Sequence, residues 1–316
     1  MMVPVDLIHY PDDARPAVWR APVLALGNFD GVHRGHTKII ERVHRTAAER
    51  GATPVVLTFD PHPTRVLRPD KAPPVIMTGA QKIEAFEQAG MGGVAVVRFT
   101  AELSRWEPET FVRTVLVAWL GVSEVWVGAN FLFGHERSGT FAALRALGSA
   151  FGFRADKIDP VCYKDVVVSS TRIRRLIAEG RVDEGAALLG HHYYIDGEVV
   201  AGDERGRMLG FPTANLRTEN ELLPPRGVYA TVAGVGAALY PAVTNLGVRP
   251  TFGPAGVPAI EAHLLRGGRD LYGERIRLYF VQRLRDERAF DSVDGLKLQI
   301  DQDCRHVEAL FERISV

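Results

Sequence analysis

Cysteine is scarce in this chain, with two among its 316 residues. Cys162 and Cys304 lie far apart and belong to no Cys-x-x-Cys pair or Cys/His cluster. Their placement argues against a disulfide framework and gives no sign of a structural zinc site. We therefore expect the chain to work in a reducing environment, which is the cytoplasm.

Long apolar runs and an excess of one charge are also missing. No apolar stretch reaches the roughly 20 residues that cross a bilayer, and Asp6 and Asp12 interrupt the region where a signal peptide has its apolar core. The 38 basic and 38 acidic residues cancel, so no overall charge attracts nucleic acid or an anionic membrane. We expect small-molecule partners, no nucleic-acid partner and no membrane anchor, in a monomer or a homo-oligomer.

In the first half, short apolar runs alternate with longer amphipathic stretches. This alternation indicates βαβ units and a parallel sheet covered by helices on both faces. The expected strands are Val23–Leu26, Val55–Thr58, Val94–Val97 and Val125–Gly128, then a strand pair at Phe153–Ile158 and Val166–Val168. The expected helices are Thr37–Ala48, Gln81–Ala89, Phe111–Leu120 and Phe141–Phe151. Ligands in open α/β sheets bind beyond the carboxyl ends of the strands, so the loops there predict the active site.

The second half has a different pattern. Two short helices are expected at Thr171–Glu179 and Val182–Leu189, and short β-rich segments separated by Gly and Pro follow. The segments are Tyr194–Val200, Val228–Val232, Ala242–Leu246, Ala259–Leu265 and Arg275–Val281. Their spacing predicts a small antiparallel barrel, and Gly295–Ile314 predicts a helix packed against it. With a chain this long, we expect two domains, residues 1–188 and 189–316.

The segment Gly27-Asn28-Phe29-Asp30-Gly31-Val32-His33-Arg34-Gly35-His36 follows the first predicted strand and leads into a helix. A helix N-terminus offers unpaired N–H groups and a positive dipole end, both of which suit phosphate. His33 and His36 add N–H donors, and Gly35 leaves room for a phosphate against the backbone. The pattern favours charge stabilisation in nucleotidyl transfer without an enzyme nucleophile. The alternative is a tight turn with solvated histidines.

Ser169-Ser170-Thr171-Arg172-Ile173-Arg174 is a second helix start with hydroxyl and guanidinium groups. Ser170 or Thr171 can be explained as a helix cap. Capping leaves Arg172 and Arg174 unexplained, because cations near a helix N-terminus are unfavourable unless an anion is present. A triphosphate would supply that anion.

Two polar groups of the second half point to phosphoryl transfer. Thr213 and Asn215 stand two residues apart after glycine-rich sequence, so in an extended segment both can present oxygen to Mg²⁺. From the spacing alone, a glycine-rich hairpin with a polar face is the favoured explanation. Glu261 and His263 share a strand face, and a carboxylate there can accept a proton from a hydroxyl. An exposed strand glutamate is the commoner explanation.

Together these motifs resemble the prokaryotic bifunctional riboflavin kinase/FAD synthetase family. The first half carries GNFDGVHRGH, TFDPHP, VGANFLFG and VSSTRIR, and the second half carries GRMLGFPTAN, GVYA, NLGVRPTF, IEAHLL and DLYG in the family's order. The resemblance covers nearly the whole chain. It implies a Rossmann-like nucleotidyltransferase domain followed by a small β-barrel, with riboflavin phosphorylated to FMN and FMN adenylylated to FAD, both using ATP and Mg²⁺.

The resemblance also implies roles for individual residues. Catalytic roles fall to His33, His36 and Glu261, and Mg²⁺ binding to Thr213 and Asn215. ATP contacts are expected at Gly27, Asn28, Gly35, Ser170, Thr171, Arg174, Gly206, Pro212, Thr213 and Asn215. Flavin contacts are expected at Phe59, Pro61, His62, Asn130 and Arg249. Without the family, His62 between two prolines could be a rigid surface turn.

The sequence departs from the family pattern at three places: His191-His192 where Arg-Pro is usual, Leu132 in a loop position that is often polar, and a short segment between Phe252 and Glu261. These departures bear on the domain junction and the flavin contacts. The arginines between Arg266 and Arg288 alternate with acidic residues, which favours a solvated face over a nucleic-acid site. Two rival functions are a kinase with an inactive first half and a flavin-binding regulator without turnover.

Overall fold

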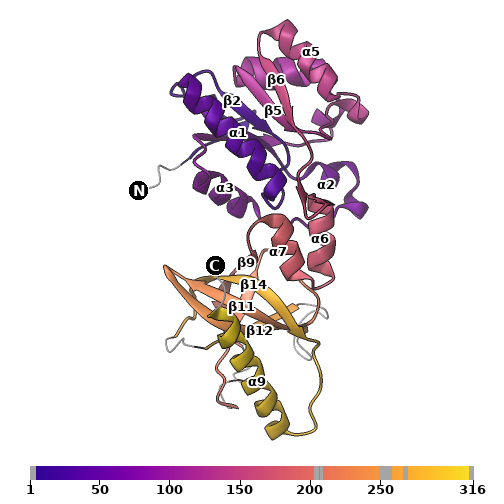
Figure 1. The fold of residues 1–316 in the computed structure, drawn as a ribbon. Coiled ribbons are helices and arrows are strands. Elements are labelled where there is room, and N and C mark those ends of the chain that lie inside the picture. Colours follow the sequence, from indigo (N-terminus) through magenta and orange to yellow (C-terminus); the bar gives the residue numbers. More distant parts are fainter. Residues whose placement is uncertain (1–4, 203–205, 207–208, 249–257, 266–269, 313–316) are drawn as a thin grey trace. The chain divides into compact units, whose positions relative to one another are not determined.

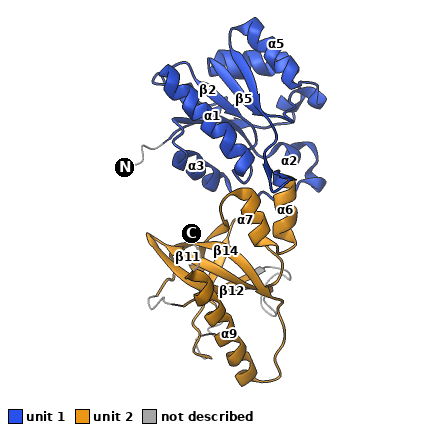
Figure 2. Cartoon of the chain, viewed as in Figure 1, with its two compact units in different colours: residues 1–170 blue, residues 171–316 orange. Residues whose placement is uncertain are grey.

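The computed structural model describes residues 5–202, 206, 209–248, 258–265 and 270–312. The chain forms two compact units, residues 1–170 and 171–316, shown in different colours in Figure 2. Figure 1 labels the main helices and strands of both units. No helix in the described residues is long and apolar enough to span a membrane.

The first unit is built on a six-stranded parallel sheet in the order β1-β4-β3-β2-β5-β6. Its strands are β1 (Asp6–Tyr10), β2 (Val23–Leu26), β3 (Pro54–Asp60), β4 (Gly93–Arg98), β5 (Glu124–Gly128) and β6 (Arg154–Ile158). The chain runs outward from β2 in one direction through β3 and β4, then in the other through β5 and β6. The strand order therefore reverses between β2 and β5, which is where α/β sheets bind ligands.

Helices cover the sheet and fix the positions of the strand ends. They are α1 (Arg34–Arg50), α2 (Pro63–Leu67), α3 (Gly79–Gln88), α4 (Pro108–Phe111), the π-helix η3 (Val112–Trp119) and α5 (Phe141–Phe151), with short 3₁₀ turns η1 (Pro69–Lys71), η2 (Leu103–Arg105) and η4 (His135–Arg137). Leu24 and Leu26 pack in one apolar cluster with Val112 and Leu116 of η3. Ala25 lies between these two leucines, so its side chain points to the opposite face of the sheet. It is also buried, and α1 packs against β2, β3 and β5.

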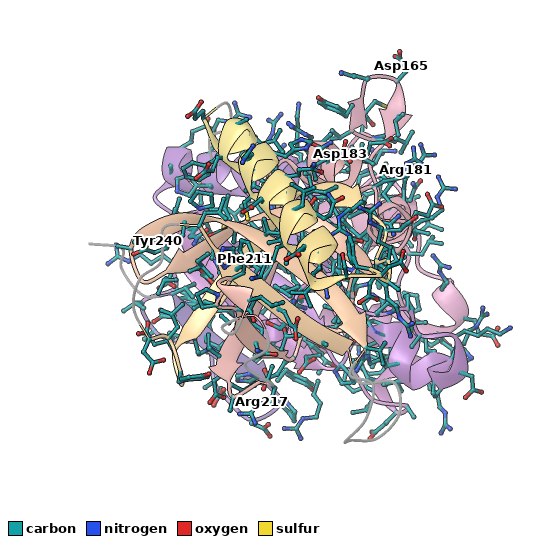
Figure 3. All side chains as sticks on the ribbon, turned by 90° about the horizontal axis from the view of Figure 1, so that it is seen from below. Asp165, Arg181, Asp183, Phe211, Arg217 and Tyr240 are labelled. Atoms are coloured by element: carbon teal, nitrogen blue, oxygen red, sulfur yellow. The ribbon has the colours of Figure 1, made fainter. Side chains whose placement is uncertain are left out.

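The second unit holds a closed antiparallel barrel in the order β10-β13-β12-β11-β14-β9. Helices α6 (Ser170–Ala178) and α7 (Val182–Leu189) precede it, and its strands are β9 (Tyr193–Val200), β10 (Ala214–Thr218), β11 (Gly227–Val235), β12 (Ala238–Val248), β13 (Pro258–Leu264) and β14 (Arg275–Arg285). The helix α9 (Val293–Phe311) crosses the barrel in Figure 3. Its Val307 packs with Val228, Val243 and Val281.

One ion pair ties α9 to the barrel. Arg285 of β14 donates two hydrogen bonds to the same Asp303 oxygen, from Nε at 3.0 Å and from Nη2 at 2.8 Å. The Asp303 side chain is only 7% exposed, and Gln299 donates to its other oxygen at 3.0 Å. A planar guanidinium paired with a carboxylate in this way fixes the orientation of both groups.

The predicted architecture is confirmed, with an α/β first half and an antiparallel barrel closed by a C-terminal helix. The strand pair expected between Phe153–Ile158 and Val166–Val168 is wrong. The strand β6 pairs with β5, whereas Val166–Val167 (β8) pairs with Cys162–Tyr163 (β7). Lys164 and Asp165, with φ of 45° and 64°, form the two-residue turn that this tight hairpin requires.

Three strands and one helix type were not foreseen, and one of these strands is β7 of the hairpin described above. In β1 only Ile8 is buried, so it has little apolar pattern, and β10 supplies a sixth barrel strand. The expected helix at Phe111–Leu120 is present, but most of it is π-helical. By contacts α6 and α7 group with the barrel, and the boundary between residues 188 and 189 stays a prediction.

We predict that Asp303→Ala destabilises the second unit by about 3 kcal/mol, because it leaves a largely buried guanidinium without its carboxylate. Urea unfolding of the full chain measures the change. The control is Asp286→Ala, since Asp286 pairs with Arg283 but is 83% exposed, and exposed pairs contribute at most about 1 kcal/mol. Equal effects of the two substitutions would contradict the prediction.

Candidate functional site

The loop between β2 and α1 brings the two predicted histidines together. His33 caps α1, and its Nδ1 accepts a hydrogen bond from the His36 N–H at 3.3 Å. The two rings stack with centroids 3.6 Å apart and planes 14° from parallel. Because Nδ1 of His33 accepts, the proton of the neutral ring resides on Nε2.

Burial lowers the pKa of His36 well below its usual value, with further lowering by the nearby His33 and Lys82. The imidazole is therefore neutral at pH 7 and acts as a hydrogen-bonding group rather than as a cation. Its Nδ1 atom is buried and has no hydrogen-bond partner within the described chain. A buried polar atom left in this way is expected to bond to a water molecule, an ion or a ligand.

Gly35 has a structural role that the sequence analysis did not assign. A Cβ at this position would lie 3.2 Å from Cε1 and Nδ1 of His33. The missing side chain therefore makes room for the His33 ring rather than only for a phosphate. Its contact with ATP stays a prediction.

Asp30 anchors this loop, a role that the sequence analysis did not assign. Its Oδ1 accepts the backbone N–H groups of Ile76 at 2.9 Å and Met77 at 3.2 Å, immediately before α3. Its carbonyl oxygen accepts the Ser170 hydroxyl at 2.9 Å. Thr58 at the end of β3 donates to the Asn28 carbonyl at 3.1 Å. The predicted residues Asn28, His33, His36 and Ser170 are thus connected through one hydrogen-bonded loop.

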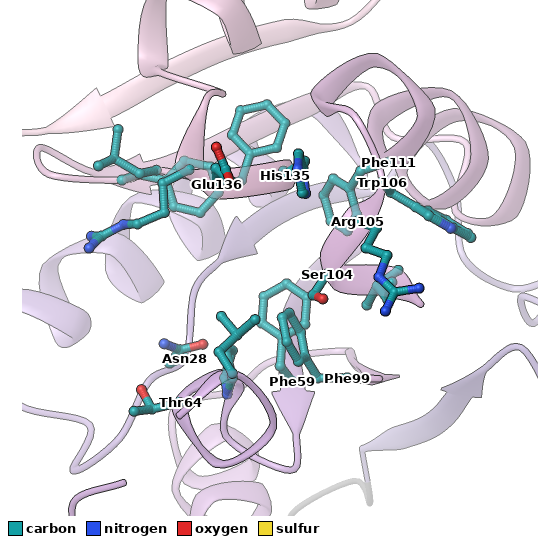
Figure 4. A pocket seen from close by; sticks show the side chains of 18 of the residues that line it. Asn28, Phe59, Thr64, Phe99, Ser104, Arg105, Trp106, Phe111, His135 and Glu136 are labelled. Atoms are coloured by element: carbon teal, nitrogen blue, oxygen red, sulfur yellow. The ribbon is translucent and has the colours of Figure 1, made fainter. Parts of the chain in front are cut away.

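A cavity of about 960 Å³ opens beside this loop at the carboxyl ends of the strands (Figure 4). Gly27, Asn28, Phe59 and Asn130 line it, as does Leu132. Its other aromatic walls are Phe99, Trp106, Phe111, Phe131 and Phe133. The rings of Phe59 and Phe99 meet edge to face, with centroids 5.8 Å apart. Such a space suits a flat aromatic ligand.

Some predicted residues lie elsewhere. Pro61 and His62 are not among the described residues that line the cavity; His62 caps α2, where its Nδ1 accepts the Thr64 N–H at 3.3 Å. Thr171 and Arg174 lie on α6, which is grouped with the second unit. Arg249 lies outside the described residues. The roles assigned to these five residues stay predictions.

In the second unit, strand register brings Asn215 and Glu261 together. Asn215 of β10 is directly opposite Glu261 of β13, and Glu261 is directly opposite Asn245 of β12. Directly opposed residues point to the same face of a sheet. The three polar side chains therefore form a row across three strands, in which Asn245 is a member that the sequence analysis did not assign.

Close backbone packing holds the segment that carries Thr213. A Cβ at Gly206 would collide with the Phe211 carbonyl and lie 3.2 Å from Thr213 Oγ1, and a Cβ at Gly202 would collide with the Asn215 amide. His263, two residues beyond Glu261, donates from Nδ1 to the Pro212 carbonyl at 2.8 Å. Gly206, Pro212, Thr213, Asn215 and Glu261 therefore belong to one neighbourhood.

Comparisons with known proteins agree with this division. A family model described as FAD synthetase matches residues 15–172, and one described as riboflavin kinase matches residues 189–311. The bifunctional riboflavin kinase/FMN adenylyltransferase of Escherichia coli K12 is 38% identical over 283 residues, 89% of this chain and 90% of that protein. The chain belongs to the bifunctional riboflavin kinase/FMN adenylyltransferase family.

Other members of the family show the same extent of similarity. The Bacillus subtilis protein is 36% identical over 297 residues, 92% of this chain and 93% of that protein. A solved structure described as a macrolide-efflux protein from Streptococcus pneumoniae has a TM-score of 0.87, 27% identity, and coverage of 96% of this chain and 99% of that chain. The fold of both units is thus shared with a known structure over almost its full length.

We predict that His36→Ala or His33→Ala slows FAD formation from FMN by about 10²–10³, since each removes a group that is expected to stabilise developing charge. FMN formation should persist, because its predicted residues belong to the other unit. Chromatographic assays of both products measure this. His44→Ala is the control, because His44 is an exposed residue of the same helix. Equal loss of both activities in a folded variant would contradict the assignment.

Proposed function

We propose that the second unit phosphorylates riboflavin with ATP to give FMN and ADP, and that the first unit transfers an adenylyl group from a second ATP to FMN, giving FAD and pyrophosphate. The observation that carries the proposal is the match of two family models, in this order, to two stretches that each contain one cluster of polar residues. Riboflavin, FMN and ATP are thus the small-molecule substrates, and the cytoplasm remains the predicted location.

In adenylyl transfer, a phosphate oxygen of FMN attacks the α-phosphorus of ATP, and the bond to pyrophosphate breaks. The reaction needs no enzyme nucleophile, so the chain contributes positioning and charge stabilisation. In our proposal, the N-terminus of α1 with His33 and His36 faces the phosphates. The aromatic cavity with Phe59 and Asn130 holds the flavin ring next to Gly27 and Asn28.

In the kinase reaction, we assign Glu261 as the acceptor of the proton from the terminal ribityl hydroxyl. Asn215 stands directly opposite Glu261, so the hydroxyl to be activated and the phosphate to be transferred would meet on one face of the barrel. His263 supports this arrangement by holding the Pro212 carbonyl next to Thr213. The chain thereby orients both substrates without forming a covalent intermediate.

The residues present fit a Mg²⁺ ion that arrives with ATP. Thr213 and Asn215 offer a hydroxyl and an amide oxygen, which are hard ligands, and the close packing of Gly202 and Gly206 holds both. No cluster of three or more His, Cys, Asp or Glu side chains among the described residues could hold a metal ion, so an all-protein site is not the arrangement we propose. When bound, Mg²⁺ would offset the charge of the ATP phosphates.

One incubation separates the proposal from its two rivals. The purified chain is mixed with riboflavin, ATP and Mg²⁺, and the flavins are resolved by chromatography. FAD supports both activities, FMN alone indicates a kinase with an inactive first unit, and unchanged riboflavin indicates a binding protein. A second incubation supplies FMN directly, so that adenylyl transfer is tested without the kinase step.

We predict that Glu261→Gln lowers the kinase turnover number by roughly 10²–10⁴, because glutamine keeps the size and hydrogen bonding of the side chain but cannot accept the proton. Riboflavin and ATP affinities, measured by calorimetry, should change little, and FAD formation from supplied FMN should be normal. Asn215→Ala should weaken productive ATP–Mg²⁺ binding as well.

Glu198→Gln is the matched control for this variant, because Glu198 is a strand glutamate whose side chain is 42% exposed and pairs with Arg217. If Glu261→Gln has a kinase turnover number near that of the wild type, Glu261 has no more effect on the reaction than Glu198. The proton acceptor would then have to be another residue.

We also predict that a fragment of residues 189–316 folds and makes FMN but no FAD, because it contains the complete barrel and α9. A fragment of residues 171–316 should melt at a higher temperature, since α7 packs against β9 and β14 and Gly180 packs against Pro225 and Arg283. Calorimetry and the flavin assay compare the two fragments. Inactivity of both, with several start points tried, would show that the kinase needs the first unit.

A further inference from the structure

Two segments that are not adjacent in sequence line the aromatic cavity of the first unit side by side. Residues 103–106 and residues 131–137 all line it, and their short helices η2 and η4 pack against each other. Figure 4 shows His135 of the second segment across the cavity from Phe59. The second segment contains the end of the VGANFLFG motif. The chemistry proposed above leaves unexplained why this motif ends in a glycine, Gly134.

The two segments are joined at Gly134. The backbone N–H of His135 donates to the Trp106 carbonyl oxygen at 2.8 Å. Gly134 itself lies against Pro108, because a Cβ at this position would lie only 2.7 Å from Cγ, 2.8 Å from Cδ and 2.9 Å from N of that proline. A side chain at residue 134 would therefore push the two segments apart.

The backbone conformation of Gly134 is a separate constraint. Its φ of 72° and ψ of −177° form a combination that is found essentially in glycine alone. A positive φ does not by itself bring a neighbour close, since Gly152 has a φ of 84° and nothing within 4 Å of a Cβ built on it. Conformation therefore explains a glycine at residue 134, but it does not explain the close approach to Pro108.

The contact at Gly134 bears on three aromatic rings of the cavity. Phe131 and Phe133 lie just before Gly134 in the chain, and their rings stack with centroids 5.4 Å apart. The Phe133 ring lies 5.9 Å from that of Phe111, and all three rings line the cavity. Because closely packed groups transmit strain, a displacement at Gly134 would reach the surface that a ligand contacts.

We propose that Gly134 is a positioning residue that fixes the aromatic wall against which the flavin ring binds. The inference rests on the flavin site and the adenylyl transfer proposed above. Gly134 acts through its neighbours, by allowing residues 131–137 to approach Pro108, and it takes no part in the bond-breaking step. Its substitution should therefore affect the binding of FMN more than that of ATP, whose phosphates are assigned to the N-terminus of α1.

Gly134→Ala tests the proposal, because the added methyl group must move residues 131–137 by several tenths of an ångström to reach an ordinary contact with Pro108. The KM for FMN in FAD formation should rise about ten- to a hundredfold. FMN binding measured by fluorescence without ATP should weaken to the same extent. The KM for ATP, and FMN formation from riboflavin, should change little.

Gly152→Ala is the control, since it also places alanine at a positive φ in the same unit but meets no neighbour. Both variants should lower the melting temperature, because alanine is strained at a positive φ. The KM for FMN should change only in Gly134→Ala. FMN binding by Gly134→Ala equal to that of Gly152→Ala would overturn the proposal. Equal weakening of FMN and ATP binding would also overturn it, because Gly134 would then serve only the stability of the unit.

A second substitution tests the contact from its other side. Pro108→Ala removes Cγ and Cδ and leaves the backbone nitrogen, so adding it to Gly134→Ala should restore part of the FMN affinity. The double variant also decides the case in which Gly134→Ala alone does not fold, since it should bind FMN more weakly than Pro108→Ala. Equal FMN affinities of these two variants would contradict the proposal. A wild-type chain that binds FMN but makes no FAD would contradict the adenylyl transfer, whereas the FMN affinities would still decide the role of Gly134.

Discussion

The buried carboxylate of Asp30 is the interaction on which the first unit's site depends. One oxygen atom receives two backbone N–H groups from the segment before α3, and the carbonyl of the same residue receives the Ser170 hydroxyl. Three segments far apart in sequence are therefore held at one residue. Because the side chain is 3% exposed, water cannot replace these bonds without loss of stability. The loop that carries His33 and His36 is held in position by these bonds.

Much of the architecture was predictable because it depends on the spacing of apolar residues and on the Gly and Pro residues that mark turns. Alternating strand and helix patterns predicted the parallel sheet, and glycine-separated β segments predicted the barrel. The strand β1 was missed because its sequence, DLIHY, has a single buried residue, so it has no apolar pattern to detect. The Cys162–Val167 hairpin was misassigned because its turn is formed by Lys164 and Asp165 with positive φ angles, rather than by the glycine or asparagine that usually indicates such a turn.

The sequence proposes candidate site residues where chemistry follows directly from a motif, and it misses those that depend on tertiary contacts. His33 and His36 stand in a recognisable sequence at a strand end, and so do Thr213 and Asn215. Asn245 becomes notable only through its register with Glu261. Gly35 was assigned to a phosphate, whereas the structure shows the His33 ring beside it.

The pairing between β10 and β13, which we call the seam, is short. It carries Asn215 and Glu261, two of the residues that we assign to the kinase site. Among the residues that the structure describes, β10 and β13 pair at two positions, Ala214 with Ala262 and Asn215 with Glu261, whereas β11 and β12 pair at nine. Separating this seam would part Asn215 from Glu261 while the longer ladders stayed intact, because few hydrogen bonds resist it. A nucleotide that contacts both strands would bind better when β10 and β13 are paired than when they are apart. Nucleotide binding would therefore stabilise the closed barrel, and opening of the barrel would weaken nucleotide binding.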